Sequence, residues 1–218
     1  MKTQFVLIPL MLLAAAALAC GGLPSAVTSP ALYKDNFSDS SSGWCVSSSA
    51  NSATAYAGGE YVFKVLRGNW YVWCNPGQTF SDIHVDVTAK NNSNTDDTYF
   101  GLICDDTKSA DQKTETFYYL GFTRVNSYTI TMSSNGKDTV LSEGTSPSIT
   151  TNANSYSVGA DCPSNGHLAL YADGKQISTA TDTTLSSGDI GLFAWSGDQA
   201  PAEIHYNNVV VTKLAASK

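Results

Sequence analysis

Residues 83–90 read IHVDVTAK, so that Ile83, Val85, Val87 and Ala89 alternate with polar side chains. Successive side chains of a β-strand point to opposite faces, and this alternation therefore gives one buried face and one solvated face. An amphipathic helix would instead repeat its apolar positions every three or four residues. The segment predicts a half-buried antiparallel strand.

The same alternation recurs from Leu32 onward, where no helical stripe is longer than a turn or two. It occurs in Tyr61-Phe63-Val65, Phe100-Leu102-Cys104, Tyr128-Ile130-Met132, Leu168-Leu170-Ala172 and Ile190-Leu192-Ala194. Pairs that favour tight hairpin turns lie between such segments, including Asn135-Gly136 and Asp173-Gly174. Residues 91–98 and 107–116 are polar without a pattern, and we expect long loops there. About twelve strand candidates predict an all-β fold with two packed antiparallel sheets.

The composition excludes some partners. The chain has 218 residues and a formal net charge of −7 at pH 7, with 12 Lys and Arg against 19 Asp and Glu. Because the cations are scarce and scattered, neither nucleic acid nor an anionic lipid surface is an expected partner. This length corresponds to one domain behind the N-terminal segment described next.

The N-terminal segment has the pattern of an export signal. Lys2 precedes an apolar run from Phe5 to Leu18, which is too short to span a membrane and is followed by small residues. Ala17-Leu18-Ala19-Cys20 resembles the lipobox of bacterial lipoproteins, although that family usually places its leucine three residues before the cysteine.

The lipobox resemblance implies that residues 1–19 are removed as a signal peptide and that Cys20 carries lipid. The protein would then be anchored at the cell membrane on its extracytoplasmic face. An ordinary secretory signal cleaved nearby is the alternative. Residues 20–31, rich in small residues and proline, predict a tether, and residues 32–214 predict the β-sandwich domain.

Four further cysteines, Cys45, Cys74, Cys104 and Cys162, form an even set in an exported chain and predict two disulfides. The chain has no Cys-x-x-Cys motif and its three histidines lie far apart, so the sequence gives little support for a zinc site.

Several short motifs occur in an order found in a known family. They are Leu32-Tyr33-Lys34-Asp35-Asn36-Phe37-Ser38-Asp39, Ser42-Gly43-Trp44, Gly59-Glu60-Tyr61, Asn69-Trp70-Tyr71, Phe100-Gly101-Leu102-Ile103-Cys104, Phe117-Tyr118-Tyr119 and Asp173-Gly174. In this order the chain resembles bacterial lipoproteins with a concanavalin A-like lectin/glucanase jelly roll, and domains related to laminin G or called 3-keto-disaccharide hydrolase.

This resemblance implies a sandwich whose first and last strands lie side by side, near residues 35–37 and 206–211. It also implies that Cys104 pairs with Cys162, which leaves Cys45 to pair with Cys74.

The carboxylate pattern of the glucanases of this fold, Glu-x-Asp-x-x-Glu on one strand, is absent. Asp82, His84 and Asp86 share one strand face, but a solvated face explains them more simply. No Gly-x-Ser-x-Gly motif occurs, so we predict no catalytic residue. The expected loops contain acids that could bind a cation or a sugar hydroxyl and that otherwise serve solubility: Asp96, Asp97, Asp105, Asp106 and Asp111.

The strongest functional signal is aromatic, in residues 69–73 (NWYVW) and 117–119 (FYY). Strand alternation places Tyr71 and Trp73 on one face and Trp70 on the other. We expect the rings of Tyr71 and Trp73 to stack on a sugar while Asn69 and nearby acids bind its hydroxyls. In the alternative, all four tryptophans fill the interior of the sandwich.

Asp35, Asp39, Asn207 and Asn208 would converge if the terminal strands pair. Oxygen ligands of this kind can hold a structural Ca²⁺, and ordinary turn and edge hydrogen bonding is the alternative. We predict no other cofactor.

Together these patterns favour a lipid-anchored protein that binds carbohydrate or another cell-surface ligand without catalysis. A glycoside-cleaving enzyme of the 3-keto-disaccharide hydrolase-like type is one alternative. A structural or adhesive envelope protein is the other.

Overall fold

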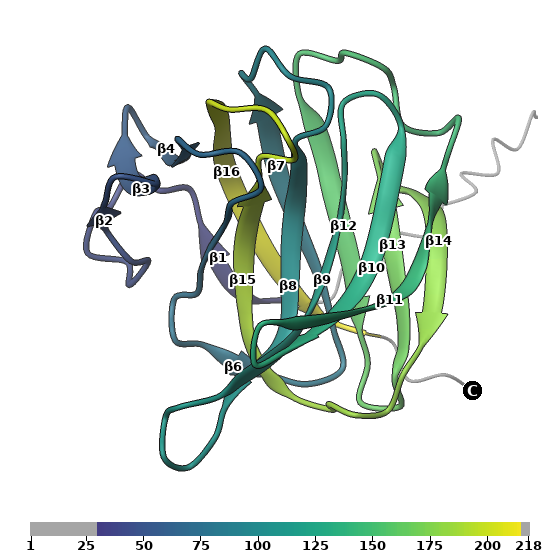
Figure 1. The fold of residues 1–218 in the computed structure, drawn as a ribbon. Helices are drawn as coiled ribbons and strands as arrows, with labels where there is room; N and C mark the ends of the chain where they lie inside the picture. The colour runs from purple at the N-terminus through teal and green to yellow at the C-terminus, as the bar shows by residue number, and fades with distance from the viewer. Residues whose placement is uncertain (1–29, 215–218) are drawn as a thin grey trace, which may run out of the picture.

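The computed structural model describes residues 30–214, which fold into two antiparallel β-sheets packed face to face (Figure 1). In Figure 1 the strands β8, β9, β10 and β15 belong to one layer, and β7, β12, β13 and β16 to the other. No helix among the described residues is long and apolar enough to cross a membrane. The predicted all-β sandwich is confirmed.

The first sheet has nine strands in the order β14-β13-β12-β7-β16-β4-β3-β2, with β1 also paired to β16. These strands are β1 (Ala31–Asp35), β2 (Ser47–Ser48), β3 (Ser52–Ala57), β4 (Glu60–Val65), β7 (Ile83–Asn91), β12 (Tyr156–Cys162), β13 (His167–Ala172), β14 (Lys175–Thr181) and β16 (Ala202–Lys213). The expected hairpin turn at Asp173-Gly174 joins β13 to β14.

The second sheet has seven strands in the order β11-β10-β9-β8-β15-β5, with β6 also paired to β15. These strands are β5 (Tyr71–Cys74), β6 (Thr79–Phe80), β8 (Tyr99–Lys108), β9 (Glu115–Phe122), β10 (Ser127–Ser134), β11 (Lys137–Thr145) and β15 (Gly188–Trp195). The stretch 107–116 is therefore not the expected long loop, because strands β8 and β9 extend into it from both sides.

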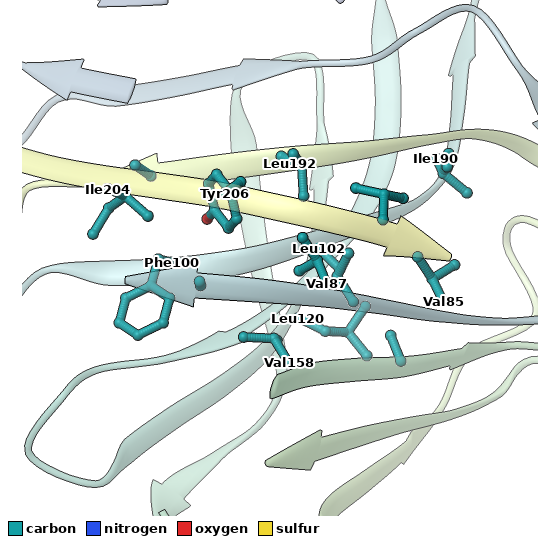
Figure 2. Packing of buried hydrophobic residues seen from close by; sticks show 14 of the residues in the cluster. Val85, Val87, Phe100, Leu102, Leu120, Val158, Ile190, Leu192, Ile204 and Tyr206 are labelled. Carbon is teal, nitrogen blue, oxygen red and sulfur yellow. The ribbon is translucent and has the colours of Figure 1, made fainter. Parts of the chain in front are cut away.

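The core lies between the sheets and follows the alternation in the sequence. Val85 and Val87 of β7 are at most 1% exposed, and they lie among Leu102, Leu192 and Tyr206 from strands of both sheets (Figure 2). Every second residue of these strands contributes to one continuous apolar cluster. The opposite faces of both sheets remain available for other contacts.

The Tyr206 hydroxyl crosses the core and binds the backbone of the other sheet. It donates a hydrogen bond to the Phe193 carbonyl at 2.6 Å and accepts one from the Gly101 amide at 2.9 Å. Buried backbone groups need such partners, so this hydroxyl fixes β16 against β8 and β15.

Two disulfides add covalent links, with the pairing that the resemblance implied. Cys104 of β8 is bonded to Cys162 of β12, which joins the two sheets. Cys45, which precedes β2, is bonded to Cys74 at the end of β5. Each disulfide therefore connects a strand of the seven-stranded sheet to a strand, or to the segment before a strand, of the nine-stranded sheet.

The first and last strands lie side by side, as the resemblance implied. β1 pairs antiparallel with β16, and Asp35 is the register partner of Val209. β1 begins at Ala31, which the sequence had assigned to the tether. The expected signal peptide and Cys20 lie outside the described residues.

Candidate functional site

The aromatic strand β5 presents two rings on the face of its sheet opposite to the core. Val72 and Cys74 are buried in the core, whereas Tyr71 and Trp73 belong to a second cluster. Their ring centroids lie 5.2 Å apart. The strand parity expected from the sequence is therefore present in the structure.

Neighbouring strands extend this second cluster into an aromatic surface. Phe193 of β15 lies 5.5 Å from Tyr71, and Phe117 of β9 lies 5.6 Å from Trp73, between ring centroids. Tyr119 of β9 lies 5.5 Å from Tyr71. Buried rings of this cluster support the half-buried ones, so Tyr71 and Trp73 are held in place from below.

The surface is hollowed to a volume of about 470 Å³, which we call the aromatic hollow. Its apolar lining is Tyr71, Trp73, Phe117, Tyr119 and Trp195, and its polar lining is Lys113, Glu115, Ser133, Asn135 and Asp138, with Gly136 in the turn beside them. Rings with polar groups around them suit a ligand that has both apolar faces and hydroxyls.

Some polar groups of the hollow already have partners. The Tyr119 hydroxyl donates a hydrogen bond to Asp138 at 2.9 Å, and Lys113 lies 3.5 Å from Asp111. The Tyr71 hydroxyl is buried without a partner, and burial raises its pKa well above the usual range. Tyr71 therefore offers its ring, rather than an ionised oxygen, to a ligand.

A β-bulge between Cys104 and Thr107 buries two carboxyl groups that we expected in an exposed loop. Asp105 has a φ of 55° and is 3% exposed, and Asp106 is 6% exposed. Burial, with the charge of Asp82, raises the pKa of Asp105 to about 7. The solubility role expected for Asp105 and Asp106 is wrong, because both lie within β8.

Glu115, the first residue of β9, lines the hollow although the sequence patterns above did not indicate it. It lines the hollow with Phe117 and Tyr119, which follow it at intervals of two in the same strand. Because Glu115, Phe117 and Tyr119 share one face of the strand, the alternation in the sequence could have predicted the position of Glu115. Phe193 was missed for a different reason, since its place beside Tyr71 depends on the pairing of β15 with β5.

Asn69 does not take the position that we expected. It precedes β5, its side-chain amide donates a hydrogen bond to Asp198 at 2.8 Å, and it is not among the residues that line the hollow. The backbone of Asn69 is also bonded to Gly197. The expected role of Asn69 in binding hydroxyls at this site is therefore not supported, and Asn135 is the amide at the hollow.

The four tryptophans do not all fill the interior. Trp44 is buried in the core. Trp70 is half-buried against the core, and the Arg67 guanidinium lies 5.4 Å from the centroid of the Trp70 ring. Trp73 lies in the second cluster and Trp195 lines the hollow. The interior therefore accounts for only part of the aromatic content.

Three of the four residues considered for Ca²⁺, Asp35, Asp39 and Asn208, line one hollow, and the carboxylates of Asp35 and Asp39 already accept hydrogen bonds. Asp35 accepts hydrogen bonds from the Phe37 amide at 2.7 Å and the Trp44 indole at 2.9 Å. Asp39 accepts from Ser41, and the side chain of Asn207 donates to the Gly59 carbonyl, outside that hollow. Within residues 30–214 no three His, Cys, Asp or Glu side chains gather as metal ligands. These contacts are those of turns and strand edges.

His84 forms an ion-pair network on the outer face of the nine-stranded sheet. Its ring nitrogens lie 2.6 Å from Asp161 and 3.0 Å from Asp86, and Tyr171 donates to Asp161 at 2.7 Å. Hydrogen bonds to Asp161 and Asp86 raise the pKa of His84 to about 9. The charged side chains of His84, Asp86 and Asp161 therefore pair with one another. They lie on the nine-stranded sheet, whereas the hollow lies on the seven-stranded sheet.

No protein-family model matches the chain. No curated protein matches it either. Several solved structures have the same fold as this chain. The carbohydrate-binding module CBM66 from Bacillus subtilis is 17% identical with a TM-score of 0.60, over 79% of this chain and 96% of that chain. A Bacillus licheniformis β-glucanase is 16% identical with a TM-score of 0.60, over 85% and 100%.

A Bacillus subtilis protein of unknown function with a galectin-like fold is 13% identical with a TM-score of 0.67, over 85% and 97% of the two chains. At such identities the likeness shows the fold alone. The chain therefore has the concanavalin A-like jelly roll that its motifs suggested.

Proposed function

We propose that this protein binds carbohydrate through the aromatic hollow, without cleaving it, while held by lipid at the extracytoplasmic face of the cell membrane. The observation that carries the proposal is the arrangement of the half-buried rings of Tyr71 and Trp73 beside Glu115, Asn135 and Asp138 in one hollow. Aromatic rings stack on the apolar face of a pyranose, and flanking polar groups bind its hydroxyls.

Two further observations support binding of a sugar. Solved structures of this fold include a protein named as a carbohydrate-binding module and others named as glucanases. The hollow also lies on the face of the seven-stranded sheet opposite to the core, because its rings form a cluster separate from the core. The absence of the Glu-x-Asp-x-x-Glu pattern from the sequence favours binding over the glucanase reaction.

Replacing Trp73 with alanine is expected to abolish binding of mixed-linkage β-glucan, xylan, mannan or a peptidoglycan fragment, whichever the parent protein binds. A single site of this kind typically binds with a dissociation constant near 1 mM, about −4 kcal/mol, so the loss of one stacking ring suffices. Calorimetric titration of the folded variant measures the loss. The free energy of unfolding should fall about as much as in the control described next, because Trp73 and Trp70 are both half-buried.

Trp70→Ala is the matched control, since Trp70 packs against the core and not in the hollow. It should lower the free energy of unfolding by about 2 to 3 kcal/mol, less than a fully buried ring, and keep the affinity. Binding of none of these glycans by the folded parent protein would contradict the proposal. So would equal loss of binding in both variants.

Cys20→Ser is expected to release the protein from the membrane or leave its signal uncleaved. Each buried methylene of an acyl chain contributes about 0.8 kcal/mol, so two or three chains hold a protein firmly. Fractionation of a lipoprotein-processing bacterial host, with mass spectrometry of the mature N-terminus, measures both effects. Parent protein that is found in the medium without lipid on its first residue would refute the anchor.

A further inference from the structure

Glu115, which lines the aromatic hollow, has a buried carboxyl neighbour, Asp106, in the adjacent strand. Asp106 lies in β8 and Glu115 begins β9, and Thr107 pairs with Thr116 beside them. Glu115 lines the hollow with 23% of its side chain exposed, whereas Asp106 is 6% exposed. The pair therefore has one member that a ligand can reach and one that it cannot.

The buried member has one oxygen without a donor. Oδ2 of Asp106 accepts a hydrogen bond from the Asn75 amide at 2.6 Å, whereas Oδ1 is buried and no donor reaches it. A buried ionised oxygen without a hydrogen bond is costly. A proton on Asp106 removes this cost, because the acid can then donate to the Glu115 carboxylate beside it. Burial, the charge of Glu115 and the hydrogen bond between the two raise the pKa of Asp106 to about 7.

The other charged and titratable groups around Asp106 come from each adjoining strand. Lys108 of β8 lies 3.7 Å from the Glu115 carboxylate, and its charge opposes the rise in the pKa of Asp106. Asp189 of β15 is the register partner of Asp106. Burial raises the pKa of Tyr71 of β5, and the Asp106 charge contributes to the rise. Only Lys108 among these groups favours an ionised Asp106.

We infer that Glu115 accepts a hydrogen bond from a hydroxyl of the bound glycan, and that the proton held by Asp106 positions Glu115 for this contact. The inference rests on the proposed function and names a residue and a proton that it depends on. With the proton present, one oxygen of Glu115 accepts from Asp106 and the other faces the hollow. Without it, two like charges adjoin, and Glu115 moves toward Lys108 and away from the ligand.

The test measures the affinity of the folded domain for mixed-linkage β-glucan, xylan and mannan at pH 5.5 and pH 8.5 by affinity electrophoresis. The parent protein should bind about five- to tenfold more weakly at pH 8.5, the worth of one hydrogen bond. Asp106→Asn keeps a donor toward Glu115 at every pH, and its affinity should be the same at both values. Glu115→Gln should bind weakly at both.

Asp105→Asn is the matched control, because Asp105 is the adjacent buried acid and its pKa is also raised to about 7. It should retain the pH dependence of binding. A pH dependence that survives in Asp106→Asn, or that disappears equally in Asp105→Asn, overturns the inference and leaves the proposed function standing.

A second measurement needs no glycan. The tryptophan fluorescence of the free protein should show a transition at about pH 7 that Asp106→Asn lacks and Asp105→Asn keeps. Absence of this transition from the parent protein overturns the shared proton. If the transition is present but no polysaccharide binds at either pH, the proposed function fails, and the ligand contact of Glu115 fails with it.

Discussion

Replacing Cys104 and Cys162 together with alanine is expected to lower the free energy of unfolding by about 4 kcal/mol. The disulfide has a sequence separation of 58 residues and joins β8 to β12 across the two sheets. Its removal gives the unfolded chain many more conformations, because a long loop is no longer closed. Both cysteines are fully buried, so the loss of their sulfur atoms adds to the cost. Urea unfolding at equilibrium measures the change.

The second disulfide provides the control. Cys45 and Cys74 are separated by 29 residues, and the same chain-entropy argument gives about 3.5 kcal/mol for their replacement. The longer loop should therefore show the larger loss. A Cys104→Ala/Cys162→Ala variant that unfolds at the urea concentration of the parent protein would show that the link between the sheets adds nothing to stability.

The protein is expected to be more stable near pH 5 than near pH 8. Asp105 and Asp106 each have a folded-state pKa of about 7, against an ordinary value of 3.8. A raised pKa means that the folded state binds the proton more tightly, so this stabilisation is complete below about pH 4 and is lost as the pH rises through 7. Each group should remove about 2 to 4 kcal/mol between pH 4 and pH 8.

Asp105→Asn and Asp106→Asn test this directly, because the amide cannot ionise and has nearly the same shape. Asparagine also tolerates the positive φ of residue 105. Urea unfolding at pH 5 and pH 8 should show a smaller difference in each variant than in the parent protein, and a still smaller one in the double variant. If the parent protein is equally stable at both values, these carboxyl groups are not protonated in the folded state.

Other groups shape the limits of this pH range. The pKa of His84 is raised to about 9 by hydrogen bonds to Asp161 and Asp86, so its stabilisation is complete below pH 6.5 and is lost as the pH rises through 9. The pKa of Asp182 is lowered by hydrogen bonds from Tyr118 and Thr184, and its stabilisation is lost as the pH falls below about 4. Together with Asp105 and Asp106, these two groups place the maximum of the free energy of unfolding between about pH 4 and pH 6.5.

Much of the fold could be predicted from local alternation, since residues 83–90 place their apolar side chains in the core as expected. Alternation fails where a bulge shifts its phase, and for this reason Asp105 and Asp106 were assigned to a loop. A polar pair with one residue at positive φ has no strand signature in the sequence. The hairpin of β8 and β9 therefore looked like a loop although its backbone pairs almost to its tip.

The candidate site could be predicted only in part. The parity of Tyr71 and Trp73 follows from their positions in one strand, and the structure places both in the hollow. Glu115 shares the parity of Phe117 within β9, so a local pattern indicates its face. The position of Phe193 beside Tyr71 depends instead on the pairing of β15 with β5, which are far apart in sequence. The prediction for Asn69 is not supported because this residue precedes β5 and has a positive φ of 52°, so strand parity does not apply to it.

The pairing of β1 with β16 has a practical consequence for protein engineering. Ala31 and Thr212 are register partners, so the chain enters and leaves the domain at neighbouring points. A module with adjacent entry and exit points can be spliced into a surface loop of a host protein through short linkers, or have its strands circularly permuted, without stretching either partner. The sandwich is therefore suited to insertion into another protein as a complete domain.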